Sequence, residues 1–345
     1  MVKNKRVIEK NNNQLPQWKK KQIIKKERSF VSAVKLVLLV LLLLGLVFVI
    51  YQIIVQLRKP RWDGRSNFNF TISWQDQFLV VSYKPSAKIA SVLYIPADTY
   101  ISLAKGFGEY PAGSVWPLGE LEDFGGGRLA QLSAQHFLGV PIRGWGRVDE
   151  SNNFFENDEK EIKVGKKELI VLFGKLIISR KTNIGLFDLV RLFYSLNSLP
   201  LSNFKYYSLQ KTRSGEYVKL PDGSLVFKVK SEFLDSLVKE VFQDPSVIDE
   251  GIIWAVINDT DHRGMALETA RLINNSGGEV TIVYDTDKPI AGGIYCREEN
   301  ICETYSVRMF AESLGLPIIV EDLNESRAEV VLVVDEKYWE KFYKR

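Results

Sequence analysis

Residues 67–100 read NFNFTISWQDQFLVVSYKPSAKIASVLYIPADTY, and this stretch decides the fold of the first folded region. Residues 67–81 alternate in polarity and are rich in aromatic and β-branched side chains, which is typical of a β-strand. Residues 90–95 form a short apolar segment that ends at Pro96, which predicts a second, buried strand. The folded region is therefore expected to begin with strands rather than with a helix.

Helical patterns follow these strands. Residues 129–138 carry leucines and a phenylalanine at helical spacing, and Gly139 and Pro141 end the segment. Together with the strands they predict an α/β core over residues 66–243. Its other expected elements are a glycine-rich loop at 106–127, an acidic loop at 149–161, an apolar segment at 167–178, helices at 186–196 and 233–242, and a hairpin at 216–227 that turns at Asp222-Gly223.

The pattern changes after the Asp244-Pro245 break. Strand and helix patterns then alternate, which predicts a second, small α/β domain over residues 250–345 with a partly parallel sheet. The expected strands are 251–257, 279–284, 317–320 and 328–334, and the expected helices are 265–274 and 302–314.

An apolar run lies close to the N-terminus. Residues 36–51 are unbroken (LVLLVLLLLGLVFVIY), and the run extends to Val55 with Gln52 as its one polar residue. At 1.5 Å per residue it spans about 30 Å, the thickness of the hydrocarbon core of a bilayer. A cleaved signal peptide is the alternative, but its apolar region would be roughly 7–15 residues long. The sequence therefore predicts one transmembrane helix over residues 36–56.

Charge is divided unevenly along the chain. Residues 1–35 contain 11 Lys and Arg against 2 Asp and Glu, whereas residues 36–345 contain 35 against 40. The positive-inside rule predicts a basic cytoplasmic tail and extracytoplasmic domains at a cell membrane. The tail charge also suits attraction to anionic lipid. The mildly acidic remainder argues against a nucleic-acid partner, which would need a basic face.

The chain has two cysteines, Cys296 and Cys302. Two cysteines are too few for a disulfide scaffold, but a single bridge would close a small polar loop. Two free thiols are the alternative.

Several segments, in order and spacing, resemble the LytR-CpsA-Psr (LCP) family of bacterial envelope proteins. Residues 76–85 (DQFLVVSYKP) are followed at the family's distance by residues 95–100 (IPADTY), where the family reads Ile-Pro-Arg-Asp-Thr. The glycines at 125–126 and residues 138–141 (LGVP) match the next segment, and residues 182–190 a later helix. Residues 251–341 resemble the LytR C-terminal domain that often follows the LCP domain.

This resemblance implies an activity. Active family members are phosphotransferases that move a glycopolymer from a polyprenyl pyrophosphate to peptidoglycan, with a divalent metal such as Mg²⁺ and several arginines. Developing charge on phosphoryl oxygens calls for guanidinium forks and a cation held by carboxylates. By resemblance, Asp76 and Asp98 are the metal and pyrophosphate ligands.

The sequence departs from the family where the arginines are expected. Ala97 stands where the family has an arginine between Pro96 and Asp98, and the family's later arginine cluster has no counterpart. Arg128, Arg143, Arg147 and Arg180 are the candidate replacements. We therefore expect a shortened LCP-like core without turnover and with no cofactor. It would act as a scaffold or binder that engages a polyprenyl-linked glycan, peptidoglycan or another envelope protein.

Two alternatives remain open. A divergent phosphotransferase using Mg²⁺ is the enzyme alternative, and a sensor whose tail reports inward is the other. Two loop features also allow two interpretations each. Gly125–Gly127 either cradles phosphate or feeds a helix, and Trp116 and Trp145 either stack on sugars or cover the core edge.

Overall fold

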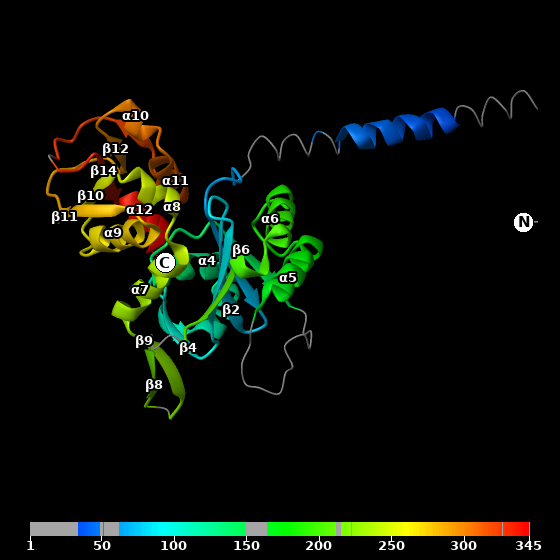
Figure 1. Ribbon diagram of the computed structural model, residues 1–345, viewed down its shortest axis with the longest axis horizontal. Helices are drawn as coiled ribbons and strands as arrows, with labels where there is room; N and C mark the ends of the chain where they lie inside the picture. The colour runs from blue at the N-terminus through cyan, green and yellow to red at the C-terminus, as the bar shows by residue number, and fades with distance from the viewer. Residues whose placement is uncertain are drawn as a thin grey trace, which may run out of the picture. The chain divides into compact units, whose positions relative to one another are not determined.

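The computed structural model describes residues 34–48, 51, 62–149, 164–211, 215–221, 223–325 and 327–344 (Figure 1). The chain divides into two compact units, Met1–Lys59 and Pro60–Arg345. The second unit spans both of the predicted α/β domains.

Little of the first unit is described. Residues 34–48 and 51 are helical, so the predicted membrane helix at 36–56 is covered only in part. Among the described residues, no helix combines the length and the apolar character that crossing a membrane requires. The predicted basic tail, 1–35, lies outside the described residues except for its last two positions.

The core sheet of the second unit has five strands in the order β6-β1-β2-β3-β7. The strands β1, β2 and β3 form an antiparallel meander, β6 lies parallel to β1, and β7 lies parallel to β3. The bounds are β1 (Phe68–Trp74), β2 (Gln77–Lys84), β3 (Ile89–Ile95), β6 (Gly144–Val148) and β7 (Phe204–Ser208).

Both faces of this sheet are buried. Alternate side chains of β2 point to opposite faces: Leu79 lies in the cluster with α5 (Lys166–Ser179) and α6 (Leu186–Ser198). Its neighbour Val80 lies in the cluster with α4 (Gly126–Leu138) and α7 (Ser231–Phe242). The result is a three-layer α/β arrangement (Figure 1), as the sequence predicted.

The single strand predicted at 67–81 is wrong, because the structure forms a hairpin there. Trp74 pairs with Gln77, so Gln75 and Asp76 make a two-residue turn between β1 and β2. Gln75 takes the left-handed conformation (φ 51°) that such turns require. Three consecutive polar residues, 75–77, interrupt the polarity alternation here, but without a glycine they were not recognised as a reversal of the chain.

A small sheet lies beside the core sheet, in the order β5-β4-β9-β8. Here β8 and β9 form the predicted hairpin. The loop expected at 106–127 is wrong in part, because it contains a strand that pairs with β4 and a short α-helix. The elements are β4 (Thr99–Leu103), β5 (Gly108–Pro111), β8 (Gly215–Lys219), β9 (Leu225–Val229), α3 (Val115–Leu121) and the 3₁₀ helices η1 (Ala112–Ser114) and η3 (Leu201–Asn203). The acidic loop predicted at 149–161 lies outside the described residues after Asp149.

The C-terminal sheet has the order β11-β10-β14-β12-β13. It is partly parallel, as predicted: β10 lies parallel to β11 and β14, and β12 runs antiparallel to β14. Its strands are β10 (Ile253–Asp259), β11 (Glu279–Asp285), β12 (Gly293–Cys296), β13 (Ile318–Val320) and β14 (Val330–Asp335). The helices are α8 (Pro245–Glu250), α9 (Met265–Ser276), α10 (Glu299–Cys302), α11 (Tyr305–Leu314) and α12 (Glu336–Phe342). The helix predicted at 302–314 is α11, which begins three residues later than predicted.

Hydrogen bonds connect the C-terminal domain to the core. The Tyr305 hydroxyl accepts from the Asn67 backbone N–H at 3.1 Å and donates to Asp244 Oδ2 at 2.6 Å. Asp244 also caps α8 through the Ser246 N–H. Asp244 and Tyr305 thus link α11 of the C-terminal domain to the segment just before β1.

Candidate functional site

Asp76 and Asp98, the carboxylates expected to bind metal or pyrophosphate, lie at the same end of the core sheet. Asp76 is in the turn between β1 and β2, and Asp98 follows β3. The strands β2 and β3 are antiparallel neighbours in which Phe78 pairs with Ile95, so the start of β2 faces the end of β3. The topology therefore brings together the two segments that the sequence resemblance selected.

Gly113 joins these two segments. Its backbone N–H donates to the Ala97 carbonyl at 3.1 Å. A Cβ atom added at Gly113 would lie 3.0 Å from the Ala97 Cβ and 3.1 Å from the Asp76 carbonyl oxygen. The turn that carries Asp76 and the loop that carries Asp98 therefore both pack against Gly113.

Asp98 is surrounded by neutral hydrogen-bond donors. Its two carboxylate oxygens accept from Gln210 Nε2 and from the Tyr217 hydroxyl, each at 3.3 Å. Burial, followed by the charge of Asp98, raises the pKa of Tyr94 to about 12 and raises the pKa of Tyr217. Both hydroxyls therefore stay protonated at neutral pH. Asp76 is exposed in its turn.

The four arginines suggested as replacements for the family's cluster are engaged elsewhere. Within the described part of the chain, none of their ion pairs, hydrogen bonds or ring contacts reaches Asp76 or Asp98. Arg128 lies over the Phe124 ring, Arg143 contacts Glu312 and Ser66, Arg147 contacts Asp149 and the Trp116 ring, and Arg180 closes the C-terminus of α5.

The donor set at this site does not fit a divalent metal. Mg²⁺ binds oxygen ligands in near-octahedral geometry, commonly including carboxylates. Here the oxygens of Asp98 accept from N–H and O–H groups. Across the described residues, no group of three or more His, Cys, Asp or Glu side chains is arranged to hold a metal ion.

The glycines before α4 serve packing and capping. The Gly126 N–H, which the phosphate interpretation would leave free, donates to Glu120 Oε1 at 2.9 Å. Cβ atoms at Gly126 and Gly127 would overlap the indoles of Trp116 and Trp145, at 2.6 and 2.3 Å. These two indoles pack edge to face with centroids 5.4 Å apart. The geometry favours the interpretation in which Gly125–Gly127 feeds a helix over the one in which it cradles phosphate.

Cys296 and Cys302 form a disulfide, with Cα atoms 5.5 Å apart. Cys296 is the last residue of β12, and Cys302 is the last residue of α10. Both side chains are buried in the C-terminal core. The bridge thus fixes a short helix against the sheet.

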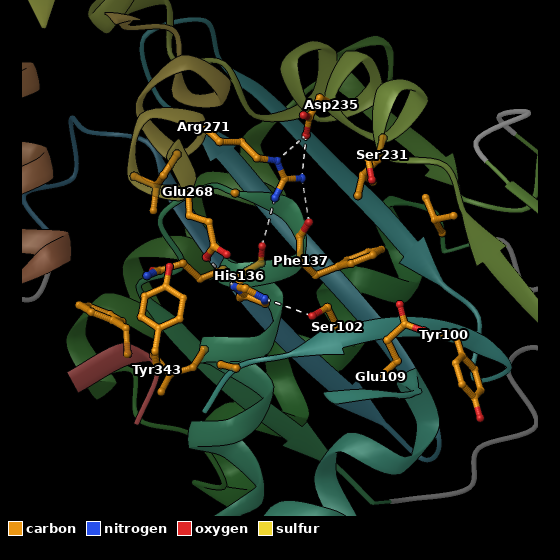
Figure 2. Close-up of a pocket in the computed structure, with 18 of the residues that line it drawn as sticks. Tyr100, Ser102, Glu109, His136, Phe137, Ser231, Asp235, Glu268, Arg271 and Tyr343 are labelled. Carbon is orange, nitrogen blue, oxygen red and sulfur yellow. Dashed lines mark hydrogen bonds and ion pairs between the residues drawn. The ribbon is translucent and has the colours of Figure 1, made fainter. Parts of the chain in front are cut away.

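A cavity of about 410 Å³ lies where the core meets the C-terminal domain (Figure 2). Its walls come from α4, β4, β5, β9 and α7 on one side and from α9 and α12 on the other. Residue patterns gave no indication of this site, because it is assembled from five segments that are far apart in the sequence. Within it, Ser102 Oγ lies 3.2 Å from His136 Nε2, and His136 Nδ1 lies 3.3 Å from Glu268 Oε2.

Arg271 links three of the helices that line this cavity, α9, α4 and α7. Arg271 on α9 donates to the carbonyl oxygens of His136 and Phe137, at 3.2 and 3.0 Å, and pairs with Asp235 at 2.7 Å (Figure 2). Asn275 donates to the Leu138 carbonyl at 3.0 Å. The open carbonyls at the C-terminus of α4 are therefore capped from the C-terminal domain.

Comparison with solved structures returns the family that the sequence resembles. A crystal structure of Bacillus subtilis TagT is 16% identical with a TM-score of 0.38, covering 53% of this chain and 92% of that chain. The LytR-CPS2A-psr family protein YwtF (TagT) with bound octaprenyl pyrophosphate lipid has the same identity and TM-score, covering 52% and 91%. Bacillus subtilis TagV also has these values, covering 51% and 96%. No family model and no curated protein sequence matches the chain.

Proposed function

We propose that this chain is a cell-envelope protein that binds a polyprenyl-linked glycopolymer, peptidoglycan or another envelope protein without turning it over. The observation that carries the proposal is the environment of Asp98. An amide and a hydroxyl satisfy its oxygens, and Ala97 stands beside it where the family has an arginine.

The physical argument concerns charge. A pyrophosphate carries at least two negative charges, which converging guanidinium forks match in geometry as well as in sign. Removing one preorganised donor typically costs about 3–4 kcal/mol of transition-state stabilisation. Among the described residues, neither Asp76 nor Asp98 forms an ion pair with a lysine or an arginine, so their carboxylates would repel the phosphates instead. This arrangement is compatible with binding through the glycan or the lipid, whereas phosphoryl transfer would lack the cationic groups that it needs.

A turnover assay tests the proposal. The purified full-length chain is incubated with a labelled polyprenyl pyrophosphate glycan, peptidoglycan fragments and either Mg²⁺ or Mn²⁺. We expect no transfer of label by the wild type or by Ala97→Arg, and retention of label or peptidoglycan on the immobilised chain. Asp287→Ala, an exposed carboxylate in the C-terminal domain, is the control.

The enzyme alternative makes the opposite prediction. If the wild type transfers label, and Asp98→Ala abolishes transfer while Asp287→Ala does not, the chain is a phosphotransferase and the non-catalytic proposal is wrong. Failure of the wild type to retain either glycan would instead remove the binding part of the proposal.

The proposal includes a position at the membrane. It is supported by the apolar run at 36–55 and by the basic tail before it, from which we infer that residues 60–345 lie outside the cytoplasm. A membrane-impermeant thiol reagent, applied to intact cells after reduction, should label Cys296 or Cys302. Labelling that requires cell lysis under the same reducing conditions would contradict this topology.

A further inference from the structure

Ser102, His136 and Glu268 form a chain of side chains along one wall of the cavity (Figure 2). Ser102 is on β4 in the small sheet, His136 is in the last turn of α4, and Glu268 is in the first turn of α9. The hydroxyl, the imidazole and the carboxylate are linked in that order, at 3.2 and 3.3 Å. This is the order in which a nucleophile, a general base and an orienting acid act.

The carboxylate decides which nitrogen of His136 carries the proton. Because Glu268 contacts Nδ1, that nitrogen is the donor, and Nε2 is left with a lone pair facing the Ser102 hydroxyl. Burial raises the pKa of Glu268, but the hydrogen bonds from His136 and Tyr343 and the charge of Arg271 outweigh this and leave the pKa below its usual range. Glu268 is therefore ionised at neutral pH and able to stabilise an imidazolium.

The surroundings hold the imidazole in this orientation. The Tyr343 ring packs edge to face on His136 with centroids 5.7 Å apart, and its hydroxyl hydrogen-bonds to Glu268. Arg271 fixes the backbone of the same turn of α4 through the His136 carbonyl. A histidine with two fixed neighbours and a capped backbone is preorganised for proton transfer.

We propose that Ser102 is a nucleophile, with His136 as its general base and Glu268 as the positioning residue, and that the cavity takes a small carboxylic ester. A volume of about 410 Å³ lies in the lower part of the range for small-molecule sites. Phe137 and Phe342 give the lining an apolar side for an acyl group, and Ser102 is partly exposed to the cavity.

The reaction balances with water as the second reactant. Ser102 Oγ bonds to the ester carbonyl carbon while its proton passes to His136 Nε2. The ester C–O bond breaks, and the leaving alcohol takes that proton. Water then attacks the acyl-serine, gives a proton to His136, and releases the carboxylic acid as the proton returns to Ser102.

A fluorophosphonate probe tests the nucleophile directly on the full-length chain. We expect mass spectrometry to find the probe on Ser102, and p-nitrophenyl acetate hydrolysis to disappear in Ser102→Ala. His136→Phe should slow labelling by about 10²–10⁴-fold, the usual contribution of a general base. Glu268→Gln should slow labelling less, and the labelling rate should rise with pH because only a neutral imidazole accepts the serine proton.

The second histidine supplies a matched control. His262 lies 3.7 Å from Glu336 and stacks on Trp339, but within the described residues no serine hydroxyl contacts its ring. His262→Phe should therefore leave the labelling of Ser102 unchanged. The thermal midpoint of each variant shows whether that variant is folded. If His136→Phe is not folded, the pH dependence of Ser102 labelling in the wild-type chain tests the role of His136 instead.

Two outcomes overturn the proposal. One is a wild-type chain in which the probe does not modify Ser102. The other is modification of Ser102 at a rate that is independent of pH and equal in folded His136 and His262 variants, which would make His136 a structural bridge between the two domains.

Discussion

Replacing Arg271 by alanine tests whether the C-terminal domain stabilises the core. The guanidinium donates to two carbonyls at the end of α4 and pairs with Asp235 on α7. The change to alanine removes these contacts, so the carbonyls of His136 and Phe137 and the carboxylate of Asp235 lose the guanidinium as a partner. Only Asn275, which caps Leu138, would remain of the α9 cap.

The magnitude follows from the contacts and their exposure. A hydrogen bond to a charged group contributes about 1.5–3 kcal/mol net. The side chains of Arg271 and Asp235 are 30% and 34% exposed, so water in the cavity would partly replace the lost contacts. We expect a loss of about 2–3 kcal/mol in the free energy of unfolding, equivalent to a fall of about 5 °C in Tm.

Differential scanning calorimetry of residues 60–345 measures this effect, and Arg263→Ala is the matched control. Arg263 precedes the same helix and is exposed, so its removal should change stability by less than about 0.5 kcal/mol. A double-mutant cycle with Asp235→Ala should give a coupling energy above about 0.5 kcal/mol. Equal Tm values for the Arg271 and Arg263 variants would refute the assignment of Arg271 as a cap.

Three further predictions concern stability. Burial lowers the pKa of Lys84 from 10.5 to about 8, so the folded state binds fewer protons than the unfolded state between these values. Lys84 should therefore contribute stability that increases from pH 8 to pH 10, measured as the difference between the thermal melts of the wild type and Lys84→Met over this range. Gly127→Ala should lower the free energy of unfolding by about 1–3 kcal/mol, because its Cβ would overlap the Trp145 indole. Gly174→Ala, whose Cβ would meet nothing within 4 Å, should raise it by about 0.5–1 kcal/mol. Equal effects of the two variants in urea titrations would contradict the packing of Gly127 on Trp145. Unreduced peptide mass spectra should contain the Cys296–Cys302 bridge, and reduction should cost about 2 kcal/mol for so short a loop; two alkylatable thiols would count against it.

Local sequence patterns predicted the type and bounds of an element where that element is long and strongly periodic. The helix at 129–138 and the strand at 90–95 were predicted within three residues at each end, because burial on one or both faces fixes their composition. The β1–β2 turn was missed because Gln75-Asp76 is not one of the glycine-containing pairs that mark hairpins. The short strand β6 was missed because its sequence, GWGRV, becomes a strand only by pairing with β1.

In the candidate sites too, the sequence indicated what depends on neighbouring strands and missed what depends on distant contacts. Asp76 and Asp98, which the resemblance selected, lie on adjoining segments because β2 and β3 are consecutive strands, and their role as ligands stays a prediction. The partners of Asp98 come from residues more than 100 positions away, and a sequence pattern carries no such information. The same holds for His136 and Glu268, which meet only after α9 docks on α4.

The order of strands in the core sheet has a consequence for synthesis of the chain. The meander β1-β2-β3 is complete once residue 95 has left the ribosome, but both of its edges and both of its faces are then uncovered. The parallel edge strands arrive only with residues 144–148 and 204–208, and the last core helix ends at Phe242. During that interval the nascent chain presents aromatic surface and open strand edges, which are the features that recruit chaperones and promote aggregation. The slow step in making this protein should therefore be closure of the sheet by distant segments rather than formation of its centre.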